Sequence, residues 1–167
     1  MPNILPGVEF LFFCLYTYAC YPADVRRREG AIVAVKSAKV RAHSATAALC
    51  TVTNDRDKVI EAVFSPKADG FTPLEIQAAA LAACIAASVR IAARAMELGP
   101  LGEIDVEVEA IKAEDEPSRL GRFEAAVSFS DPLDTAVQER LIHAAEDICT
   151  ISNTLRAGDT VVAGRRA

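Results

Sequence analysis

The stretch that decides the fold is FTPLEIQAAALAAC, residues 71–84. It begins with the signals of a helix start: Thr72 is a typical N-cap, Pro73 suits the first helical position, and Glu75 can complete a capping box with Thr72. The segment 78–89 then contains no charged residue and is dominated by alanine. We therefore expect a central helix that is buried nearly all round.

The end of this helix is predicted near Leu98. Gly99 is expected to take the left-handed C′ position, and Pro100 prevents the helix from continuing. The uncharged segment 78–89 spans about 18 Å at 1.5 Å per residue, which is too short to cross a bilayer. The sequence thus favours the core helix of a soluble domain over a membrane span.

The segments on both sides of this helix have the patterns of strands and of a second helix. Strands are predicted at 32–36, 46–53, 58–64, 104–109, 123–129 and 160–163. Turn residues at 54–57 join the second and third strands, and the alternation in 104–109 and 123–129 gives one apolar face for the helix and one polar face for water. A second helix is expected from near Asp134 to about Cys149. This order predicts an α+β domain, not a doubly wound parallel sheet.

Composition excludes several classes of protein. The chain has 167 residues, of which 51% are hydrophobic, and a net charge of −5. This length fits one ordinary domain, and an acidic surface disfavours nucleic acid and anionic membranes as partners. The sequence has no phosphate-binding glycine loop and no serine-hydrolase elbow, and its two histidines lack ligand-spaced neighbours. We expect neither a cofactor nor a metal ion.

The N-terminal segment, residues 1–30, differs from the rest. Residues 1–22 hold six of the ten aromatic residues. Their apolar run is too short for a membrane span, and the basic cluster 26–28 follows it, the reverse of the order in a secretory signal. The segment is an extra edge strand, a dimer-contact arm or a poorly ordered extension with a linker. We expect one domain over 31–167 and a cytoplasmic location.

The five cysteines are odd in number and lack C-x-x-C spacing, which argues against a disulfide-stapled scaffold and a zinc site. Cys14 and Cys20 lie in the N-terminal segment, and Cys50 lies in a predicted strand. Cys84 falls in the third turn of the central helix, where a packing role is as plausible as a chemical one. Cys149 lies where the second helix ends among small hydroxyl residues, so we expect solvent to reach it.

Two spacings in the chain resemble those of a known family. Cys84 follows Pro73 by eleven residues in the central helix, and Cys149 with Ser152 forms a C-x-x-S motif after the next helix. This arrangement resembles the OsmC/Ohr family of organic-hydroperoxide-reducing proteins, over about residues 31–163. The resemblance implies antiparallel sheets packed on a long buried central helix plus a second helix. It also implies an intertwined homodimer with the site near the interface.

The same resemblance implies a thiol peroxidase of the oxidative stress response. The Cys84 thiolate would attack the distal oxygen of a hydroperoxide, releasing an alcohol and leaving a sulfenic acid. Cys149 would resolve that acid as an intramolecular disulfide, which a dithiol such as a lipoyl protein would reduce. No cofactor, nucleic acid or membrane is implied. The alternative is a stress-related or small-ligand-binding member that keeps the fold but has structural cysteines and no turnover.

The sequence departs from the family pattern at the residues that activate the thiol. In the hydroperoxidase members an N-terminal arginine does so, oriented by a glutamate directly after the proline. Here Leu74 follows the proline and the acid is Glu75, which is either catalytic or only the helix cap. The candidate arginines are those at 26–28, Arg41 and Arg56, and the sequence does not choose among them.

Overall fold

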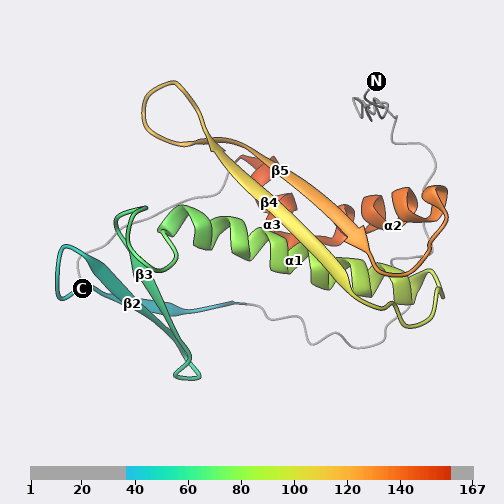
Figure 1. Ribbon diagram of the computed structural model, residues 1–167, viewed down its shortest axis with the longest axis horizontal. Helices are drawn as coiled ribbons and strands as arrows, with labels where there is room; N and C mark the ends of the chain where they lie inside the picture. The colour runs from blue at the N-terminus through green and yellow to red at the C-terminus, as the bar shows by residue number, and fades with distance from the viewer. Residues whose placement is uncertain (1–36, 159–167) are drawn as a thin grey trace, which may run out of the picture. The chain divides into compact units, whose positions relative to one another are not determined.

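A computed structural model describes residues 37–158 of the chain. Several predicted features lie outside these residues: the segment 1–30 with Cys14, Cys20 and the arginines at 26–28, and the strands at 32–36 and 160–163. The described elements are β1 (Val40–His43), β2 (Leu49–Asn54), β3 (Val59–Val63), α1 (Pro73–Ala95), β4 (Ile104–Lys112), β5 (Leu120–Phe129), α2 (Thr135–Ile148) and α3 (Thr150–Ala157) (Figure 1).

Helix α1 begins with the predicted capping box. The hydroxyl of Thr72 accepts a hydrogen bond from the Glu75 N–H at 3.4 Å, and the Glu75 carboxylate accepts from the Thr72 N–H at 2.6 Å. The Thr72 hydroxyl also donates to that carboxylate at 2.7 Å. Two N–H groups that a helix start leaves without intrahelical partners are thereby satisfied, as the sequence predicted.

The end of α1 differs from the prediction. The helix stops at Ala95, and Glu97, with a φ of 58°, takes the left-handed position that was predicted for Gly99. The N–H groups of Glu97 and Leu98 donate back to carbonyls of the last turn, both at 3.1 Å, in the pattern of a Schellman motif. Leu98 packs against the core, so tertiary packing ends the helix before the glycine is reached.

The strands form two antiparallel sheets, β1-β2-β3 and β4-β5. In β4-β5, Val106 pairs with Val127 and Val108 pairs with Ala125. Apolar side chains of this hairpin pack on the core, and Figure 1 shows the hairpin lying along α1. The predicted strands and their apolar face are thus correct. Strand β1 was not predicted, and β2 begins later than expected, because residues 44–48 form a hydrogen-bonded turn.

The exposure of α1 corrects the prediction that it is buried nearly all round. Its buried residues are Leu81, Ile85, Ser88, Val89, Ala92 and Ala93. Side chains on its other side are exposed, including those of Ala79, Ala80, Ala83 and Ala87. The reason is that β4 and α2 cover one face of the helix, and the described part of the chain brings nothing over the other. The full α1 is also long and apolar enough to cross a membrane by length and composition, but it packs against β4 and α2 as a core helix does.

The centre of the core lies beside the C-terminal half of α2. Leu141, Val89 and Cys149 are its largest fully buried side chains. Helix α2 begins at the predicted place, because the Asp134 carboxylate accepts from the Ala136 N–H at 2.9 Å. At its other end the chain turns at Cys149 and continues as α3, a helix that the sequence analysis did not predict.

Candidate active site

The fold brings together the two cysteines singled out in the sequence. Cys84 comes from the middle of α1, and Cys149 comes from the junction of α2 and α3, 65 residues later. Both are free thiols, Cys84 packs against the core cluster that contains Cys149, and each thiol shifts the pKa of the other. The third cysteine in the described range, Cys50, lies on β2 in the other sheet.

Burial distinguishes the two thiols. Cys149 is 0% exposed, so the prediction that solvent reaches it is wrong. The reason is that α3 continues directly from this residue and packs against α1 and α2. Cys84 is only partly buried. A reagent that arrives from solvent therefore meets Cys84 before Cys149.

The first turn of α3 supplies hydrogen-bond donors to both sulfurs. Cys149 is the N-cap of α3, and its Sγ accepts from the Ser152 N–H at 3.5 Å. The Ile151 N–H donates to both sulfurs, and the Thr150 N–H donates to Cys84. N–H groups at a helix start have no intrahelical partners and carry partial positive charge, so this turn favours a thiolate.

The sequence contains one signal for α3 that was not used. Gly158 follows Ala157 with a φ of 70°, the left-handed position that commonly ends a helix. A glycine there, with Arg156 in the last turn, is typical of a helix end. Most donors that α3 brings to the thiols are backbone groups, which no side-chain motif could have indicated; the Ser152 side chain of the C-x-x-S motif is the exception.

Electrostatics make the two thiols unequal. Burial raises the pKa of Cys149, but hydrogen bonds from the Ser152 hydroxyl, the Cys84 thiol and the N–H groups of Ser152 and Ile151 outweigh it, so the pKa lies below its ordinary value. Burial raises the pKa of Cys84, and donation to Cys149 raises it further; the N–H groups of Ile151 and Thr150 offset this only in part. The two thiols therefore titrate as a pair, with the pKa of Cys149 lowered and that of Cys84 raised.

Glu75 lies apart from the thiol pair. It is nine residues before Cys84 in the same helix, about 13 Å along the axis at 1.5 Å per residue. Its carboxylate is bound to the backbone and side chain of Thr72, and these hydrogen bonds hold the pKa of Glu75 below its usual value. These contacts are those of a helix cap.

The candidate arginines in the described range are Arg41 on β1 and Arg56 in the β2–β3 turn, both exposed. Within residues 37–158, the interactions that shift the pKa of Cys84 come from burial, from Cys149 and from the backbone of α3, and none of these is a cation.

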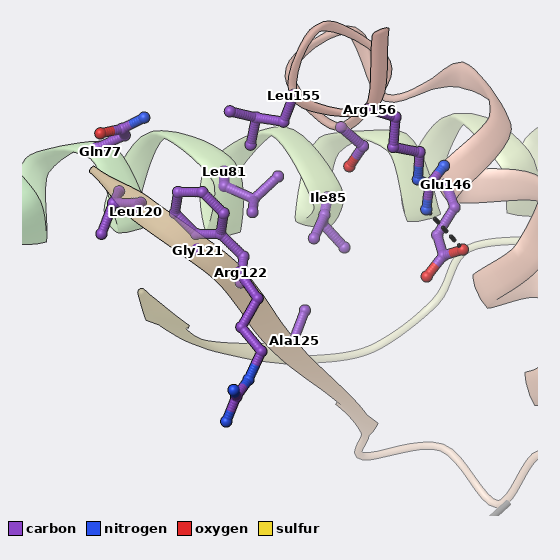
Figure 2. Close-up of a pocket in the computed structure, with 12 residues that line it drawn as sticks. Gln77, Leu81, Ile85, Leu120, Gly121, Arg122, Ala125, Glu146, Leu155 and Arg156 are labelled. Carbon is purple, nitrogen blue, oxygen red and sulfur yellow. Dashed lines mark hydrogen bonds and ion pairs between the residues drawn. The ribbon is translucent and has the colours of Figure 1, made fainter. Parts of the chain in front are cut away.

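A groove of about 520 Å³ lies next to the thiol pair, between α1, β5 and α3 (Figure 2). Its lining is Gln77, Leu81, Ile85, Leu120, Gly121, Arg122, Phe123, Ala125, Glu146, Ser152, Leu155 and Arg156. An ion pair at 3.1 Å joins Arg156 of α3 to Glu146 of α2 at one end. Ser152 belongs both to this lining and to the contacts of Cys149, so it links the groove to the buried sulfur.

Residues 37–158 contain no group of three or more His, Cys, Asp and Glu side chains that could hold a metal ion. His143, on the exposed side of α2, lies 3.6 Å from Asp147. This pair belongs to the polar surface of the helix.

Comparison with known proteins relates this arrangement to a family. The sequence profile of the family described as "OsmC-like protein" matches residues 66–163, more than half of the chain. No curated protein matches the chain.

Solved structures share the fold at low sequence identity. An OsmC-like protein from Mycoplasma pneumoniae is 20% identical, with a TM-score of 0.67 over 74% of this chain and 90% of that one. The organic hydroperoxide resistance protein OhrB of Bacillus subtilis is 26% identical, with a TM-score of 0.57 over 73% of this chain and 92% of that one. A putative osmotic stress induced and detoxification response protein from Psychrobacter arcticus 273-4 is 21% identical, with a TM-score of 0.60 over 69% and 85%. The profile match and the shared α+β fold, with antiparallel sheets beside a long central helix, lead to one conclusion: the chain belongs to the OsmC-like protein family.

Proposed function

We propose that the protein is a thiol peroxidase that reduces organic hydroperoxides to alcohols with Cys84 and Cys149. The observation that carries this proposal is the proximity of two free thiols from distant parts of the chain, which share one core cluster and shift each other's pKa. The family includes organic hydroperoxide resistance proteins, such as the one from Bacillus subtilis. Two thiols that lie close together can form a disulfide where their Cα atoms come within about 7 Å of each other.

The proposed cycle begins at the more accessible thiol. The Cys84 thiolate attacks the distal oxygen of the hydroperoxide, the O–O bond breaks, and the alkoxide leaves with a proton as the alcohol. Cys84 becomes a sulfenic acid, and Cys149 attacks its sulfur to form the disulfide and release water. A dithiol such as a lipoyl protein then reduces the disulfide by thiol exchange.

We also propose that two chains form an intertwined homodimer in the cytoplasm. The alanine side of α1 is exposed in the single chain, and so are large apolar side chains nearby in sequence, including those of Phe64, Phe71 and Leu74. Burying such a surface in a second copy is favourable at roughly 25 cal/mol per Å². The three free cysteines of the described range suit a reducing compartment.

The test uses the reduced full-length chain and one equivalent of cumene hydroperoxide. We expect one Cys84–Cys149 disulfide per chain, identified by mass spectrometry of unreduced peptides, and one equivalent of cumyl alcohol. Cys50→Ser is the matched control, because its thiol lies in the other sheet, and it should behave as the wild type. An unchanged thiol count in the wild type would overturn the proposal.

A second candidate is a small-ligand-binding protein without turnover. Two observations favour it: burial raises the pKa of Cys84, and the groove beside the pair is lined by both apolar and polar side chains but by neither cysteine. For this candidate the thiol count after peroxide would stay constant, while a ligand would shift the thermal unfolding midpoint of wild type and Cys84→Ser equally.

A further inference from the structure

Two polar side chains are buried within residues 37–158, and both lie one helical turn after a thiol. Ser88 is 4% exposed and follows Cys84 by four residues in α1. Ser152 is 9% exposed and follows Cys149 by three residues, in the first turn of α3. The other buried side chains in this part of the chain are hydrophobic, so buried polarity is confined to the two turns that follow the cysteines.

The Ser88 hydroxyl makes no hydrogen bond with the part of the chain that the structure describes. A hydroxyl inside a helix can donate to the carbonyl four residues earlier, as Thr154 does to Thr150 at 2.8 Å, but Ser88 lacks this bond. Side-chain oxygens and nitrogens that are completely enclosed all have partners in residues 37–158. The Ser88 oxygen therefore keeps some accessible surface, although the residue as a whole is buried.

Helix geometry directs the Ser88 side chain toward the turn that holds Cys84. Residues i and i+4 of an α-helix lie one above the other on the same face, with Cβ atoms about 5–6 Å apart. Every Cα–Cβ bond is tilted toward the N-terminus of the helix, so Ser88 leans toward Cys84 and away from Ala92. Cys84 is only partly buried, whereas Ala92 is 3% exposed. The hydroxyl thus leans toward the end of this row that a molecule from solvent can reach.

A buried hydroxyl without a protein partner does not help the chain to fold. Removing such a group from water without giving it a hydrogen bond costs free energy. Alanine at position 88 would avoid this cost and is a better helix former, and alanine is already the commonest residue of α1. A local choice that opposes stability in this way is typical of a residue that serves a ligand or a reaction.

We propose that Ser88 is a catalytic residue of the peroxidase reaction, whose hydroxyl donates a hydrogen bond to the leaving oxygen of the hydroperoxide while Cys84 attacks the distal oxygen. This inference rests on the proposed peroxidase function. Negative charge develops on the leaving oxygen as the O–O bond breaks, and a fixed donor in a site poor in water stabilises such a charge strongly. The Ser152 N–H is already bound to the Cys149 sulfur at 3.5 Å, whereas the Ser88 hydroxyl has its proton to donate.

The atoms and electrons of this step balance. The Cys84 thiolate gives an electron pair to the distal oxygen, an S–O bond forms, and the pair of the broken O–O bond stays on the oxygen that carries the organic group. The sulfur is oxidised to a sulfenic acid, and the hydroperoxide is reduced to an alkoxide. The alkoxide takes a proton from water and becomes the alcohol. Ser88 is unchanged at the end of the step, because it only lends a hydrogen bond.

The experiment measures O–O bond breakage in a single turnover. Reduced full-length protein is mixed with one equivalent of cumene hydroperoxide at pH 7, and the release of cumyl alcohol is followed by rapid quenching. We expect the rate for Ser88→Ala to be about tenfold or more below that of the wild type. Ser128→Ala, which removes an exposed hydroxyl from the outer face of β5, is the matched control and should follow the wild type.

A second substrate distinguishes a hydrogen bond to the leaving oxygen from a general disturbance of the site. The reaction of m-chloroperbenzoic acid expels a carboxylate, which is a far weaker base than an alkoxide and needs little help from a donor. Ser88→Ala should therefore react with this peracid at nearly the wild-type rate. A displaced Cys84 would slow both substrates equally, and that result would assign Ser88 a structural role and overturn the inference.

Thermal unfolding supplies a third measurement. Because Ser88→Ala removes a buried hydroxyl that has no protein partner, the reduced variant should unfold at a higher temperature than the wild type. A variant that is less stable would show that the hydroxyl serves the fold, and it would contradict the inference.

The outcomes separate the two proposals. A wild-type protein that releases no cumyl alcohol overturns the peroxidase function itself. A wild type that reacts, with Ser88→Ala equally fast on cumene hydroperoxide, overturns only the role of Ser88. A slower reaction with cumene hydroperoxide, an unchanged reaction with the peracid and a raised unfolding temperature together support it.

Discussion

Cys84 packs against the core cluster that contains Cys149, a residue 65 positions further along the chain, and each thiol shifts the pKa of the other. The contact joins the middle of α1 to the junction of α2 and α3. It pairs a partly buried thiol with a fully buried one, so burial sets the order in which a reagent from solvent meets them. The following predictions test what this pair and its surroundings do.

Cys84→Ser should abolish hydroperoxide reduction. Loss of a nucleophile typically lowers turnover by ~10³-fold or more, because no other group can take its place. The measurement is consumption of cumene hydroperoxide with dihydrolipoamide as the reductant. Cys50→Ser should retain the wild-type rate, and a Cys84→Ser variant with substantial activity would exclude Cys84 as the peroxidatic residue.

Glu75→Gln should keep full activity and lose only the part of the stability that the carboxylate charge contributes, since glutamine also completes a capping box. Glu75→Ala should lower the free energy of unfolding, because the Thr72 N–H loses its acceptor. Urea unfolding and peroxidase rates measure the two effects separately. A fully stable Glu75→Gln protein with a rate reduced tenfold would instead assign a catalytic role to the carboxylate.

The stabilising effect of the Glu75 charge should disappear in acid. Hydrogen bonds from Thr72 hold the pKa of this carboxyl below its usual value of 4.5 in the folded protein. A depressed pKa contributes stability that is present above pH 4.5 and is lost as the pH falls through the folded value. The difference in unfolding free energy between wild type and Glu75→Gln should therefore shrink between pH 5 and pH 3, and a difference that grows there contradicts this.

Gly70→Ala should destabilise the chain more than Gly99→Ala. Gly70 has a φ of 141°, and a Cβ there would lie 2.9 Å from the Val63 side chain. Gly99 has a φ of 78°, but a Cβ there would meet nothing within 4 Å. We expect a loss of about 2–3 kcal/mol for Gly70→Ala, from strain plus overpacking, and about 1 kcal/mol for Gly99→Ala, by thermal unfolding. Equal losses at both positions would show that the Val63 contact has no effect.

Ala83→Arg should prevent the proposed homodimer from forming. Ala83 is exposed on the α1 side that the chain leaves uncovered, and a buried unpaired arginine at an interface is costly. Light scattering after size exclusion gives the mass of wild type and variant. Asp55→Arg, in the exposed β2–β3 turn, is the control and should leave the mass unchanged. A monomeric wild type would contradict the dimer itself.

Local sequence signals predicted the parts of the fold that local chemistry determines. The capping box of Thr72 and Glu75 and the alternation in β4 and β5 depend on neighbours in sequence, and they appear as expected. The spacing of Pro73 and Cys84, together with the C-x-x-S at Cys149, pointed to the family.

Features that depend on packing could not be predicted this way. The end of α1 is set by Leu98 reaching the core, and the burial of Cys149 is set by α3 folding over it. The inequality of the two thiols depends on burial, on the Ser152 side chain and on backbone N–H groups of α3. Burial and backbone donors give no sign in the sequence, whereas Ser152 already belonged to the C-x-x-S motif.

The N-cap of helix α3 is the Cys149 sulfur, which the proposed cycle oxidises to a disulfide. When the Cys149 sulfur enters a disulfide it loses its negative charge, and its bond to the Ser152 N–H weakens. That N–H should then exchange with deuterium faster in the oxidised protein than in the reduced one. Ser152, Leu155 and Arg156 form one wall of the groove, so oxidation would loosen that wall. A reductant would then distinguish the oxidised protein from the reduced protein by the shape of the groove.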